Sequence, residues 1–562
     1  MTGTGPMHRP SITLHKAAFL CALLLAGSAA GQSPDAGNAG VPGEPDYSVR
    51  YDVLISGGTI VDGTGAPSYR AEVLIEGDGI AYVGQLDGSR IRADQVLDAT
   101  GRVVTPGFID THAHGDPLIS GLQESFVLQG VTTKVVGQDG RTPGFHMDIR
   151  AGYRLSLDEW RKSMASPDPA SEHPRSLLEW SLKVEQAGVA PNIAALVGIG
   201  SLRWMTGVGT RPVPTPEQLA MMIEILEAEM QAGAFGISSG LEYVPERYSH
   251  TDELVAMAKV VGARDGVVMS HMRTEDAGAI LGAIDELVAQ GRHARVNASH
   301  IKIVGGLTWQ EGVEVVDRIR DARAEGVDIT ADVYPYVAGM ADMALVYPSW
   351  AKQRSEFEAA AENDRPRLEQ ALFDRVMSRH GPERILIVSG EFSGKTLAEA
   401  AEALALPFVD VLIDVFGFGG PGAAHFTQSR ETHDVFIVAD HIAIGTDGSP
   451  STRHPRSYGT YPKVIEEYVV NDARMSLEKA VHKMTGLPAR ITGLRDRGTV
   501  EAGKKADLVI FAPENVRARA TWTHYDLPPE GFDFVLVNGR VAVRHGVLSE
   551  QPHGKVLRKG VN

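Results

Sequence analysis

The chain has 562 residues, a formal net charge of −17 at pH 7 and a pI of about 5.6. Hydrophobic residues make up 43% and charged residues 22%, which excludes a globally disordered chain. The acidic balance, with no block of Lys and Arg, argues against a general nucleic-acid binder or a protein bound to an anionic membrane surface. The length exceeds one ordinary domain but suits a large barrel with insertions and a smaller domain.

The first 30 residues have the order of a signal peptide. Arg9 and Lys16 precede the apolar run AAFLCALLLAG, and SAA follows at residues 28–30. The run is too short to span a bilayer, and no later segment is long enough, so we expect no stable membrane anchor. The single cysteine, Cys21, lies inside this segment. The sequence therefore predicts a periplasmic or secreted protein whose metal ligands would be His and carboxylates.

The remaining sequence predicts one domain inside another. Residues 31–50, rich in Gly and Pro, indicate a flexible linker. Short β-type runs fill 51–104 and return in 491–562, which predicts a small β-sandwich built from both ends of the chain. Between them, 105–490 alternates apolar and helical runs in the manner of a (β/α)₈ barrel. The eight expected strands are 103–110, 131–138, 192–200, 234–239, 266–271, 294–300, 327–334 and 441–447.

Two further features of the barrel region can be predicted, a helix and an insertion. Thr215 followed by Pro216 and Gln218 is a helix start with a capping box, and an apolar stripe follows at helical spacing up to Met230. The gap between the seventh and eighth strands, 337–440, is much longer than a normal crossover. It predicts an inserted lid or subdomain.

Potential metal ligands gather where the expected strands end. The carboxyl ends of parallel barrel strands converge on one face, so side chains placed there meet in one site. Four imidazoles and two carboxylates suit one or two divalent metals, zinc first. These residues are His112 and His114 after strand one, Asp139 after strand two, His271 after strand five, His300 after strand six and Asp447 after strand eight.

Several stretches resemble a known family: GFIDTHAHGD, VTTKVVGQDG, GISSGLEYVPERY, ASHIKIVG, TDGSPSTRHPRSYGTYP and KMTGLPARITGLRDRGTVEAGKKADLVIF. Together they resemble the amidohydrolase superfamily, and within it the N-acyl-D-amino-acid deacylase (D-aminoacylase) branch. The resemblance implies a (β/α)₈ barrel with a β-sandwich and a lid. It also implies zinc and hydrolysis of the amide bond of N-acyl-D-amino acids, or of peptides ending in a D-residue, by water that the metal activates.

The resemblance also assigns roles to individual residues. His112 and His114 match the ligands of one metal position, His271 and His300 those of the other, and Asp447 matches the catalytic aspartate. Lys302 and Arg456 match groups that hold the substrate α-carboxylate. Tyr334 and Tyr336 lie where the family places a tyrosine near the substrate, and the sequence does not choose between them.

One ligand departs from the family pattern. D-aminoacylases commonly carry a cysteine where this chain has Asp139. A carboxylate can bridge two metals, but a harder oxygen ligand favours Mn or Co more than a thiolate does, so metal number and identity stay open. Glu242, after strand four, is a rival for the bridging position.

Three other functions fit the sequence less well. A cyclic amidase of the hydantoinase or dihydroorotase type would need a lysine on strand four, which FGISSGLEYVP lacks. An exported metal-binding relative without catalysis is the second alternative. Gly236, Ser238 and Gly240 fit GxSxG, but no helix is expected directly after the serine, as a nucleophile elbow requires. The expected partner is a small N-acyl amino acid or short peptide; acyl and side-chain preference and oligomeric state are left open.

Overall fold

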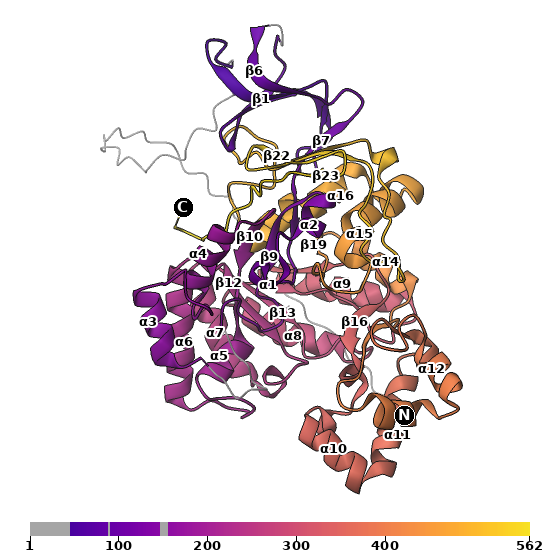
Figure 1. Ribbon diagram of the computed structural model, residues 1–562. Coiled ribbons are helices and arrows are strands. Elements are labelled where there is room, and N and C mark those ends of the chain that lie inside the picture. Colours follow the sequence, from indigo (N-terminus) through magenta and orange to yellow (C-terminus); the bar gives the residue numbers. More distant parts are fainter. Residues whose placement is uncertain (1–44, 88–89, 146–154, 562) are drawn as a thin grey trace, which may run out of the picture. The chain divides into compact units, whose positions relative to one another are not determined.

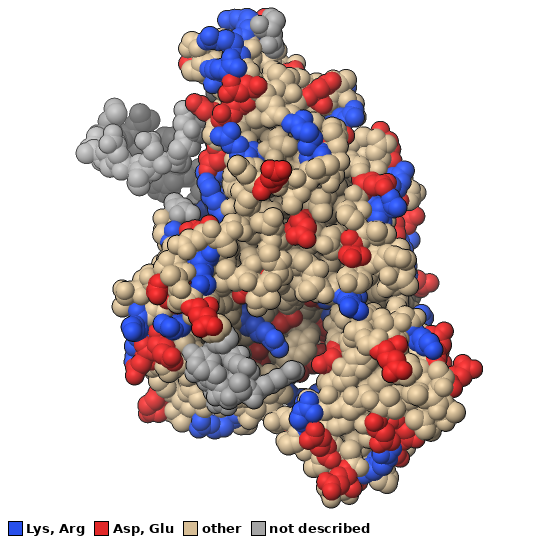
Figure 2. Space-filling model, in the orientation of Figure 1, with Lys and Arg blue, Asp and Glu red and all other residues tan. Residues whose placement is uncertain are grey.

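The computed structural model describes residues 45–87, 90–145 and 155–561 (Figure 1). The predicted signal peptide, and the linker as far as residue 44, lie outside the described residues. Among the helices of the described part, none combines the length and apolarity needed to cross a bilayer. On the face drawn in Figure 2, acidic and basic side chains are interspersed among larger uncharged areas.

The centre of the fold is a parallel barrel, as predicted. Its strands form two sheets, ordered β10-β9-β8 and β11-β12-β13-β14-β15-β19, with parallel pairing throughout. A parallel bridge between Ala113 and Gly448 joins the first sheet to the end of the second. The strands are β8 (Phe108–Asp110), β9 (Val131–Val136), β10 (Asn192–Ala195), β11 (Val197–Gly198), β12 (Gly236–Gly240), β13 (Val267–His271), β14 (Arg295–Ala298), β15 (Ile329–Val333) and β19 (Ile442–Ile444).

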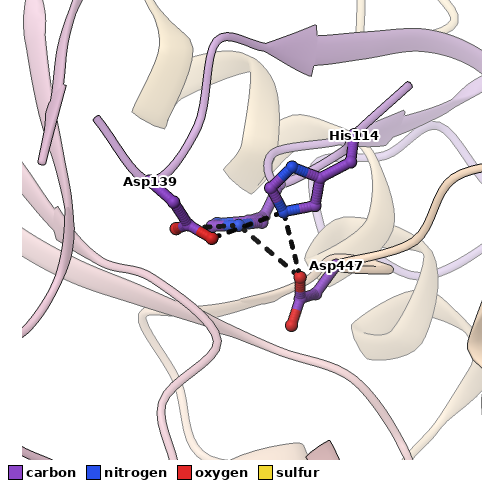
Figure 3. A group of neighbouring side chains, drawn as sticks. His114, Asp139 and Asp447 are labelled. Carbon is purple, nitrogen blue, oxygen red and sulfur yellow. Dashed lines mark hydrogen bonds and ion pairs between the residues drawn. The ribbon is translucent and has the colours of Figure 1, made fainter. Parts of the chain in front are cut away.

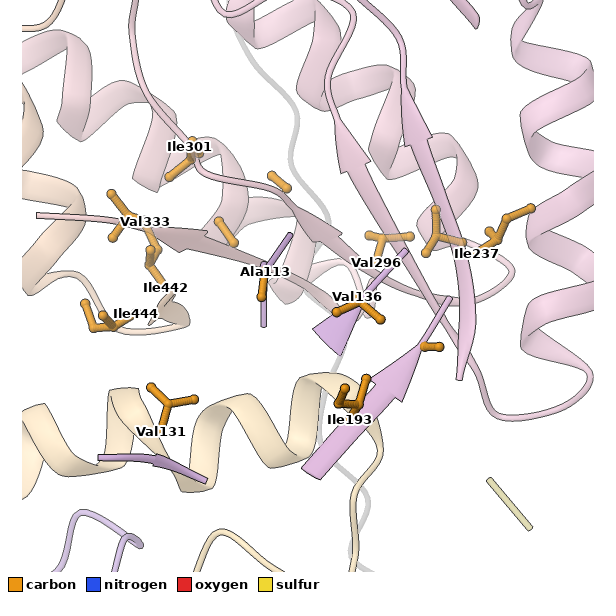
Figure 4. Packing of buried hydrophobic residues seen from close by; sticks show 14 of the residues in the cluster. Ala113, Val131, Val136, Ile193, Ile237, Val296, Ile301, Val333, Ile442 and Ile444 are labelled. Atoms are coloured by element: carbon orange, nitrogen blue, oxygen red, sulfur yellow. The ribbon is translucent and has the colours of Figure 1, made fainter. Parts of the chain in front are cut away.

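The barrel strands are buried on both faces, which explains their continuous apolar runs. Figure 4 shows Val131, Ile193, Val296 and Ile444 among the side chains of this core. The surrounding helices of the first half are α1 (Pro117–Ser120), α2 (Glu124–Leu128), α3 (Leu157–Ala165), α4 (Leu177–Ala187), α5 (Ile199–Met205), α6 (Pro216–Gln231), η2 (Glu246–Tyr248) and α7 (Thr251–Gly262). Those of the second half are α8 (Ile280–Gly291), α9 (Trp309–Ala324), α14 (Arg430–Val438), α15 (Arg456–Lys463), η7 (Val464–Asn471), α16 (Leu477–Met484) and α17 (Gly486–Thr492).

Helix α6 confirms the capping prediction. The Thr215 side chain accepts a hydrogen bond from the backbone N–H of Gln218, and the Gln218 side chain returns one to Thr215. Met222, Leu226 and Met230 of the stripe are buried. The helix also buries a carboxyl group on this face, Glu229, which the apolar pattern did not predict.

Glu229 should make the stability of the fold depend on pH. Its Oε1 accepts hydrogen bonds from Trp160 Nε1 (2.8 Å) and the Leu177 N–H (3.3 Å), whereas Oε2 has no partner. Burial raises the pKa of Glu229 from 4.5 to about 7. A raised folded-state pKa contributes stability that is fully present below pH 4.5 and is lost as pH rises through 7. Glu229→Gln, which keeps the accepting oxygen, should therefore match the wild type near pH 4.5 and exceed it by about 3 kcal/mol at pH 8.

Urea unfolding at a series of pH values measures this difference. Glu224→Gln, on the exposed side of α6 and paired with Arg161, is the matched control and should show no growing gain. A Glu229→Gln gain that stays constant between pH 5 and 8 would contradict the pKa argument.

Two further sheets are built from the ends of the chain: the first from N-terminal strands alone, the second from strands of both ends. One is ordered β5-β4-β1-β6 and the other β23-β22-β21-β20-β7-β2-β3. The two share one apolar core, with Val73 and Ile75 from the first sheet and Ile510 and Leu536 from the second. The strands are β1 (Arg50–Ser56), β2 (Thr59–Ile60), β3 (Tyr69–Arg70), β4 (Glu72–Glu76), β5 (Gly79–Gly84), β6 (Arg92–Asp98), β7 (Val103–Pro106), β20 (Leu508–Phe511), β21 (Phe532–Val537), β22 (Arg540–Arg544) and β23 (Val547–Leu548); η8 (Pro513–Asn515) follows β20.

Two expected strands are interrupted. The run 103–110 divides at Gly107 into β7, which pairs with β20 in the terminal sheet, and β8, which belongs to the barrel. The run 192–200 divides at Leu196 into β10 and β11, one in each barrel sheet, and ends in α5.

The long connection between β15 and β19 forms a subdomain with its own apolar core. Three strands pair antiparallel in the order β16-β18-β17. Its elements are β16 (Gly339–Asp342), η3 (Met343–Val346), η4 (Ser349–Ala351), α10 (Arg354–Asn363), α11 (Arg365–Met377), η5 (Pro382–Arg384), β17 (Ile385–Ile387), α12 (Leu397–Leu404), α13 (Phe408–Asp410), η6 (Val411–Phe416) and β18 (Gly422–His425). Helix α14, inside the range expected for the lid, packs on α9 and β19 and so belongs with the barrel helices.

Candidate metal centre

The six predicted ligands come together at the carboxyl ends of the barrel strands. Three of them, Asp139, His300 and Asp447, have left-handed backbone angles, with φ of 53°, 36° and 49°. That conformation costs a non-glycine residue roughly 1–2 kcal/mol. The turns after β9, β14 and β19 therefore position these three side chains at a cost in conformational free energy. The ligand-type atoms fall into two overlapping groups. One contains His112, His114, Asp139 and Asp447, and the other contains Asp139, His271 and His300.

The first group surrounds one position between two carboxylates (Figure 3). Asp447 Oδ1 lies 3.1 Å from His114 Nε2 and 3.8 Å from His112 Nε2. Asp139 approaches the same rings from the other side, with Oδ1 3.5 Å from His112 Nε2 and Oδ2 3.5 Å from His114 Nε2.

The second group shares Asp139 with the first. Its Oδ1 lies 3.7 Å from His300 Nε2 and 3.9 Å from His271 Nδ1, and these two ring nitrogens are 2.9 Å apart. The opposite nitrogen of each ring faces a carboxylate. His300 Nδ1 is 3.1 Å from Glu275 Oε1, and His271 Nε2 is 3.4 Å from Glu242 Oε2. An outer carboxylate of this kind favours the tautomer that leaves the inner nitrogen free for a metal, as Glu242 does for His271. His300 Nδ1 also lies 2.8 Å from Lys302 Nζ, so two groups compete for that nitrogen.

These residues fit a divalent metal. Zinc binds His and carboxylate ligands at 2.0–2.2 Å in a tetrahedron, which separates neighbouring ligand atoms by about 3.3–3.5 Å. The separations of Asp139 from His112 and His114, both 3.5 Å, match this value. Those from His300 and His271 are slightly longer. All four exceed good hydrogen-bond lengths. His112 is fully buried, yet neither of its ring nitrogens has a hydrogen-bond partner, and Asp139 Oδ1 also has none. Buried polar atoms without partners are costly, and a bound metal would satisfy these.

The electrostatics prepare three of the ligands in the protonation states that metals bind. Burial lowers the pKa of His112 well below its ordinary value, so the ring is neutral. Burial acts to raise the pKa of Asp139, but the surrounding imidazoles, that of His112 foremost, outweigh it and hold the pKa below its usual value. The pKa of Asp447 is likewise well below its usual value, because the Arg456 guanidinium and nearby imidazoles outweigh burial. Both carboxylates are therefore ionised.

His300 differs from these three ligands, because its pKa lies well above the usual value. Burial and Lys302 act to lower that pKa, but Asp447, Glu275 and Asp139 outweigh them. A metal would therefore have to displace a proton from this ring.

Two more buried carboxyl groups position the ligands from below. Asp110 Oδ1 accepts hydrogen bonds from the backbone N–H of His112 (3.1 Å) and of Thr446 (3.0 Å). Asp332 Oδ1 accepts one from the backbone N–H of His300 (2.7 Å). Burial raises the pKa of Asp110 to about 7 and that of Asp332 to about 6.

A cavity of about 240 Å³ opens beside the ligands and receives side chains from the lid. Three of the four predicted substrate residues, Lys302, Arg456 and Tyr334, line it. Arg456 Nη1 lies 2.7 Å from Asp447 Oδ2, and the Tyr334 hydroxyl is buried without a hydrogen-bond partner. Tyr336 is not among the lining residues; its hydroxyl donates to the Pro455 carbonyl at 3.3 Å, and its ring packs on His454. The geometry therefore favours Tyr334 as the substrate-facing tyrosine.

Several lining residues were not found from the sequence. Glu275 accepts a hydrogen bond from Lys302 Nζ at 2.7 Å, and the Tyr243 ring packs on His271 at a tilt of 51°. Glu275 could have been predicted from the sequence, because it follows His271 by four residues and so falls in the loop after the same strand. The lid residues that line the cavity could not be predicted from the sequence. They are Met340, Ala341, Leu345, Arg379, His425 and Thr427.

The GxSxG match has no elbow geometry. Ser238 lies in the middle of β12, and the next helical element, η2, begins six residues after that strand's end. The Ser238 hydroxyl donates to the Gly137 carbonyl and accepts from the Gly140 N–H, so it supports the Asp139 turn.

The chain is similar to known proteins along most of its length. A family model described as Amidohydrolase family matches residues 95–543. The chain is 32% identical to N-acyl-D-glutamate deacylase of Alcaligenes xylosoxydans xylosoxydans, over 91% of this chain and 97% of that relative. It is 31% identical to D-aminoacylase of the same organism, over 91% and 98%.

The fold is similar to that of N-acyl-D-glutamate deacylase from Bordetella bronchiseptica, solved with zinc and a phosphonate inhibitor. That structure has a TM-score of 0.75 and 29% identity, covering 91% of this chain and all of that one. D-hydantoinase, at 17% identity and a TM-score of 0.51, shares the fold alone. This chain belongs to the amidohydrolase family and, within it, to the N-acyl-D-amino-acid deacylase (D-aminoacylase) branch.

Proposed function

We propose that this protein is a metal-dependent amidohydrolase that hydrolyses the amide bond of N-acyl-D-amino acids and releases the free D-amino acid. One observation carries the proposal. Every member of the two ligand groups except the fully buried His112 lines a single cavity, together with the cations Lys302 and Arg456. The relatives named N-acyl-D-glutamate deacylase, D-aminoacylase and N-acyl-D-aspartate deacylase, at 29–32% identity over most of the chain, support it.

The metal would be held by His112, His114, Asp139, His271 and His300, with Asp447 at the edge of the first group. When bound, zinc supplies Lewis-acid chemistry, lowering the pKa of a water and polarising a carbonyl. Asp139 faces both histidine pairs, which supports its bridging role. Glu242 instead faces the outer nitrogen of His271, a position from which it would orient that ring and not bind the metal itself. An oxygen donor at position 139 leaves Mn and Co as alternatives to zinc.

Asp447 is the proton carrier of the proposed reaction. It borders the cavity and is ionised, so it accepts a proton from water as the carbonyl is attacked. The same carboxyl group then gives that proton to the departing amine nitrogen. Arg456 Nη1 lies 2.7 Å from Oδ2, whereas Oδ1 faces His114 at 3.1 Å.

The substrate's amino-acid half is held by charge. A free α-carboxylate fits the Arg456 guanidinium, which can bind both oxygens, together with Lys302 Nζ and the unpaired Tyr334 hydroxyl. Fixing the carboxylate at this end and the scissile carbonyl at the ligand groups defines two points of the molecule. The side chain on the α-carbon then has one direction left, toward the lid, and that restriction selects one configuration.

The test uses the purified protein stripped of metal and reloaded with zinc, manganese or cobalt. N-acetyl-D- and N-acetyl-L-amino acids with acidic and neutral side chains are compared by amine release. We expect metal-dependent turnover of D-substrates at least about 10²-fold above their L-isomers. Turnover of L-isomers alone would remove the D-specific assignment. Opening of hydantoins or dihydroorotate, without turnover of any linear substrate, would replace it with a cyclic amidase.

Export is a further part of the proposal. Its support is the charged, apolar and small-residue order of residues 1–30. Mass determination of the protein from the producing cells is the check, and an N-terminus near residue 31 is expected. An intact N-terminus in the cytoplasmic fraction would refute export.

A further inference from the structure

We propose that a second cavity, on the β8 and β9 side of the metal centre, binds the acyl group of the substrate and accepts acyl groups larger than acetyl, with an apolar chain or ring. The proposal rests on the deacylase function proposed above. The cavity has a volume of about 570 Å³. It is lined by Ala113, His114, Gly115, Asp116, Ile119, Val136, Gly137, Gln138, Asp139, Arg141, Thr142, Pro143, Trp180 and Tyr243.

The two cavities meet at the metal centre. His114, Asp139 and Tyr243 line both of them. The α-carboxylate anchors, by contrast, lie on one side only: Lys302 and Arg456 line the first cavity and not the second. In an amide, the nitrogen and the acyl carbon leave the carbonyl carbon in different directions. A substrate whose amino-acid half lies in the first cavity therefore directs its acyl group into the second.

Much of the wall of the second cavity is apolar, because several of its polar side chains are engaged elsewhere; the exception is Arg141, whose exposed side chain also lines the cavity. Asp116 Oδ1 accepts from Trp180 Nε1 (2.9 Å) and from the Leu118 N–H (3.0 Å). Thr142 Oγ1 accepts from the Gly198 N–H (2.8 Å), and Gln138 Nε2 donates to the Thr111 carbonyl (2.8 Å). The apolar residues that line the cavity include Val136, Trp180 and Pro143.

The rim of this cavity carries an exposed apolar side chain. Ile119, in the short helix α1, is 87% exposed. The Asp116 cap fixes the start of that helix and so the place of Ile119. An acyl chain longer than two carbons would cover Ile119 and remove apolar surface from water. An acetyl group has only one methyl carbon beyond the carbonyl and so covers less of this wall.

The size of the second cavity also favours an acyl group larger than acetyl. It is more than twice as large as the first, which must already hold the carboxylate and the side chain of the amino acid. Each additional buried methylene should raise kcat/KM about three- to fourfold, since transfer of one CH₂ from water contributes that factor.

The experiment compares acetyl, butanoyl, hexanoyl, octanoyl and phenylacetyl derivatives of one D-amino acid, with an L-alanyl-D-amino acid alongside. We expect kcat/KM to rise at least about tenfold from acetyl to hexanoyl. Ile119→Asp should lower kcat/KM for the hexanoyl substrate at least about fivefold and leave the acetyl substrate within about twofold. The control Val213→Asp, on a residue that is 65% exposed and outside both cavities, should change neither.

The outcomes separate this proposal from the function on which it rests. Turnover of the acetyl derivative with falling kcat/KM along the series overturns the acyl subsite and leaves the deacylase intact. A preference for the L-alanyl substrate over the butanoyl one overturns the apolar assignment, because a charged amine would then be favoured. Equal loss on acetyl and hexanoyl substrates in Ile119→Asp overturns the role of the rim. No turnover of any member would be failure of the deacylase function itself.

Discussion

Asp447→Asn should lower kcat by roughly 10³- to 10⁴-fold while the protein keeps its bound metal, because the amide cannot accept and return a proton. The asparagine oxygen can still face His114 Nε2, which lies 3.1 Å from Asp447 Oδ1. The backbone cost at this position should also be small, since Asn tolerates the left-handed angle found there. The loss should therefore appear in kcat, with little change in fold.

The measurements are steady-state kinetics, metal content by mass spectrometry and thermal unfolding. Asp265→Asn is the matched control, because Asp265 also has a left-handed backbone angle (φ 52°), is exposed and lines neither cavity. It should keep activity within a few-fold. Substantial turnover by metal-loaded Asp447→Asn would show that another group carries the proton.

Arg456→Ala should lower kcat/KM for N-acyl-D-amino acids by roughly 10²- to 10³-fold, chiefly through KM. Arg456 is nearly fully buried at the cavity wall, so a substrate carboxylate that loses it is left without its main counter-charge. Arg456 is also the strongest group lowering the pKa of Asp447. Its removal should therefore raise that pKa and move the acid limb of the kcat profile to higher pH.

Substrates in which a carboxamide replaces the α-carboxylate isolate the anchoring role. The wild type should lose most of its kcat/KM on such a substrate, whereas Arg456→Ala should lose little more than it has already lost. Arg453→Ala, an exposed arginine in the same loop that does not line the cavity, serves as control. An equal loss on both substrates in Arg456→Ala would mean that the arginine acts on Asp447 alone.

The barrel could be predicted from the sequence because its strands are buried on both faces and so leave continuous apolar runs. The ligands could be predicted because polar residues that follow such runs must meet at one end. The interruptions at Gly107 and Leu196 could not, since each divides a single apolar run whose two halves pair with different partners. That pairing is a tertiary property.

The choice between Tyr334 and Tyr336 shows a second limit. Residues two apart share a face only while the chain is a strand, but β15 ends at Val333, before either tyrosine. The lid contributions to the cavity were hidden for the same reason. Arg379 and His425 reach it from irregular connections and a short antiparallel sheet, whose placement no local pattern specifies.

The ligands are divided between the two barrel sheets, which a single bridge from Ala113 to Gly448 joins at one edge. The first sheet carries His112, His114 and Asp139, and the second carries the remaining three. A bound ion held by both sets would therefore cross-link two halves of the barrel that share little backbone pairing at this edge. Metal affinity and resistance to unfolding become one linked equilibrium, in which chelation loosens the closure of the barrel as well as stopping the reaction.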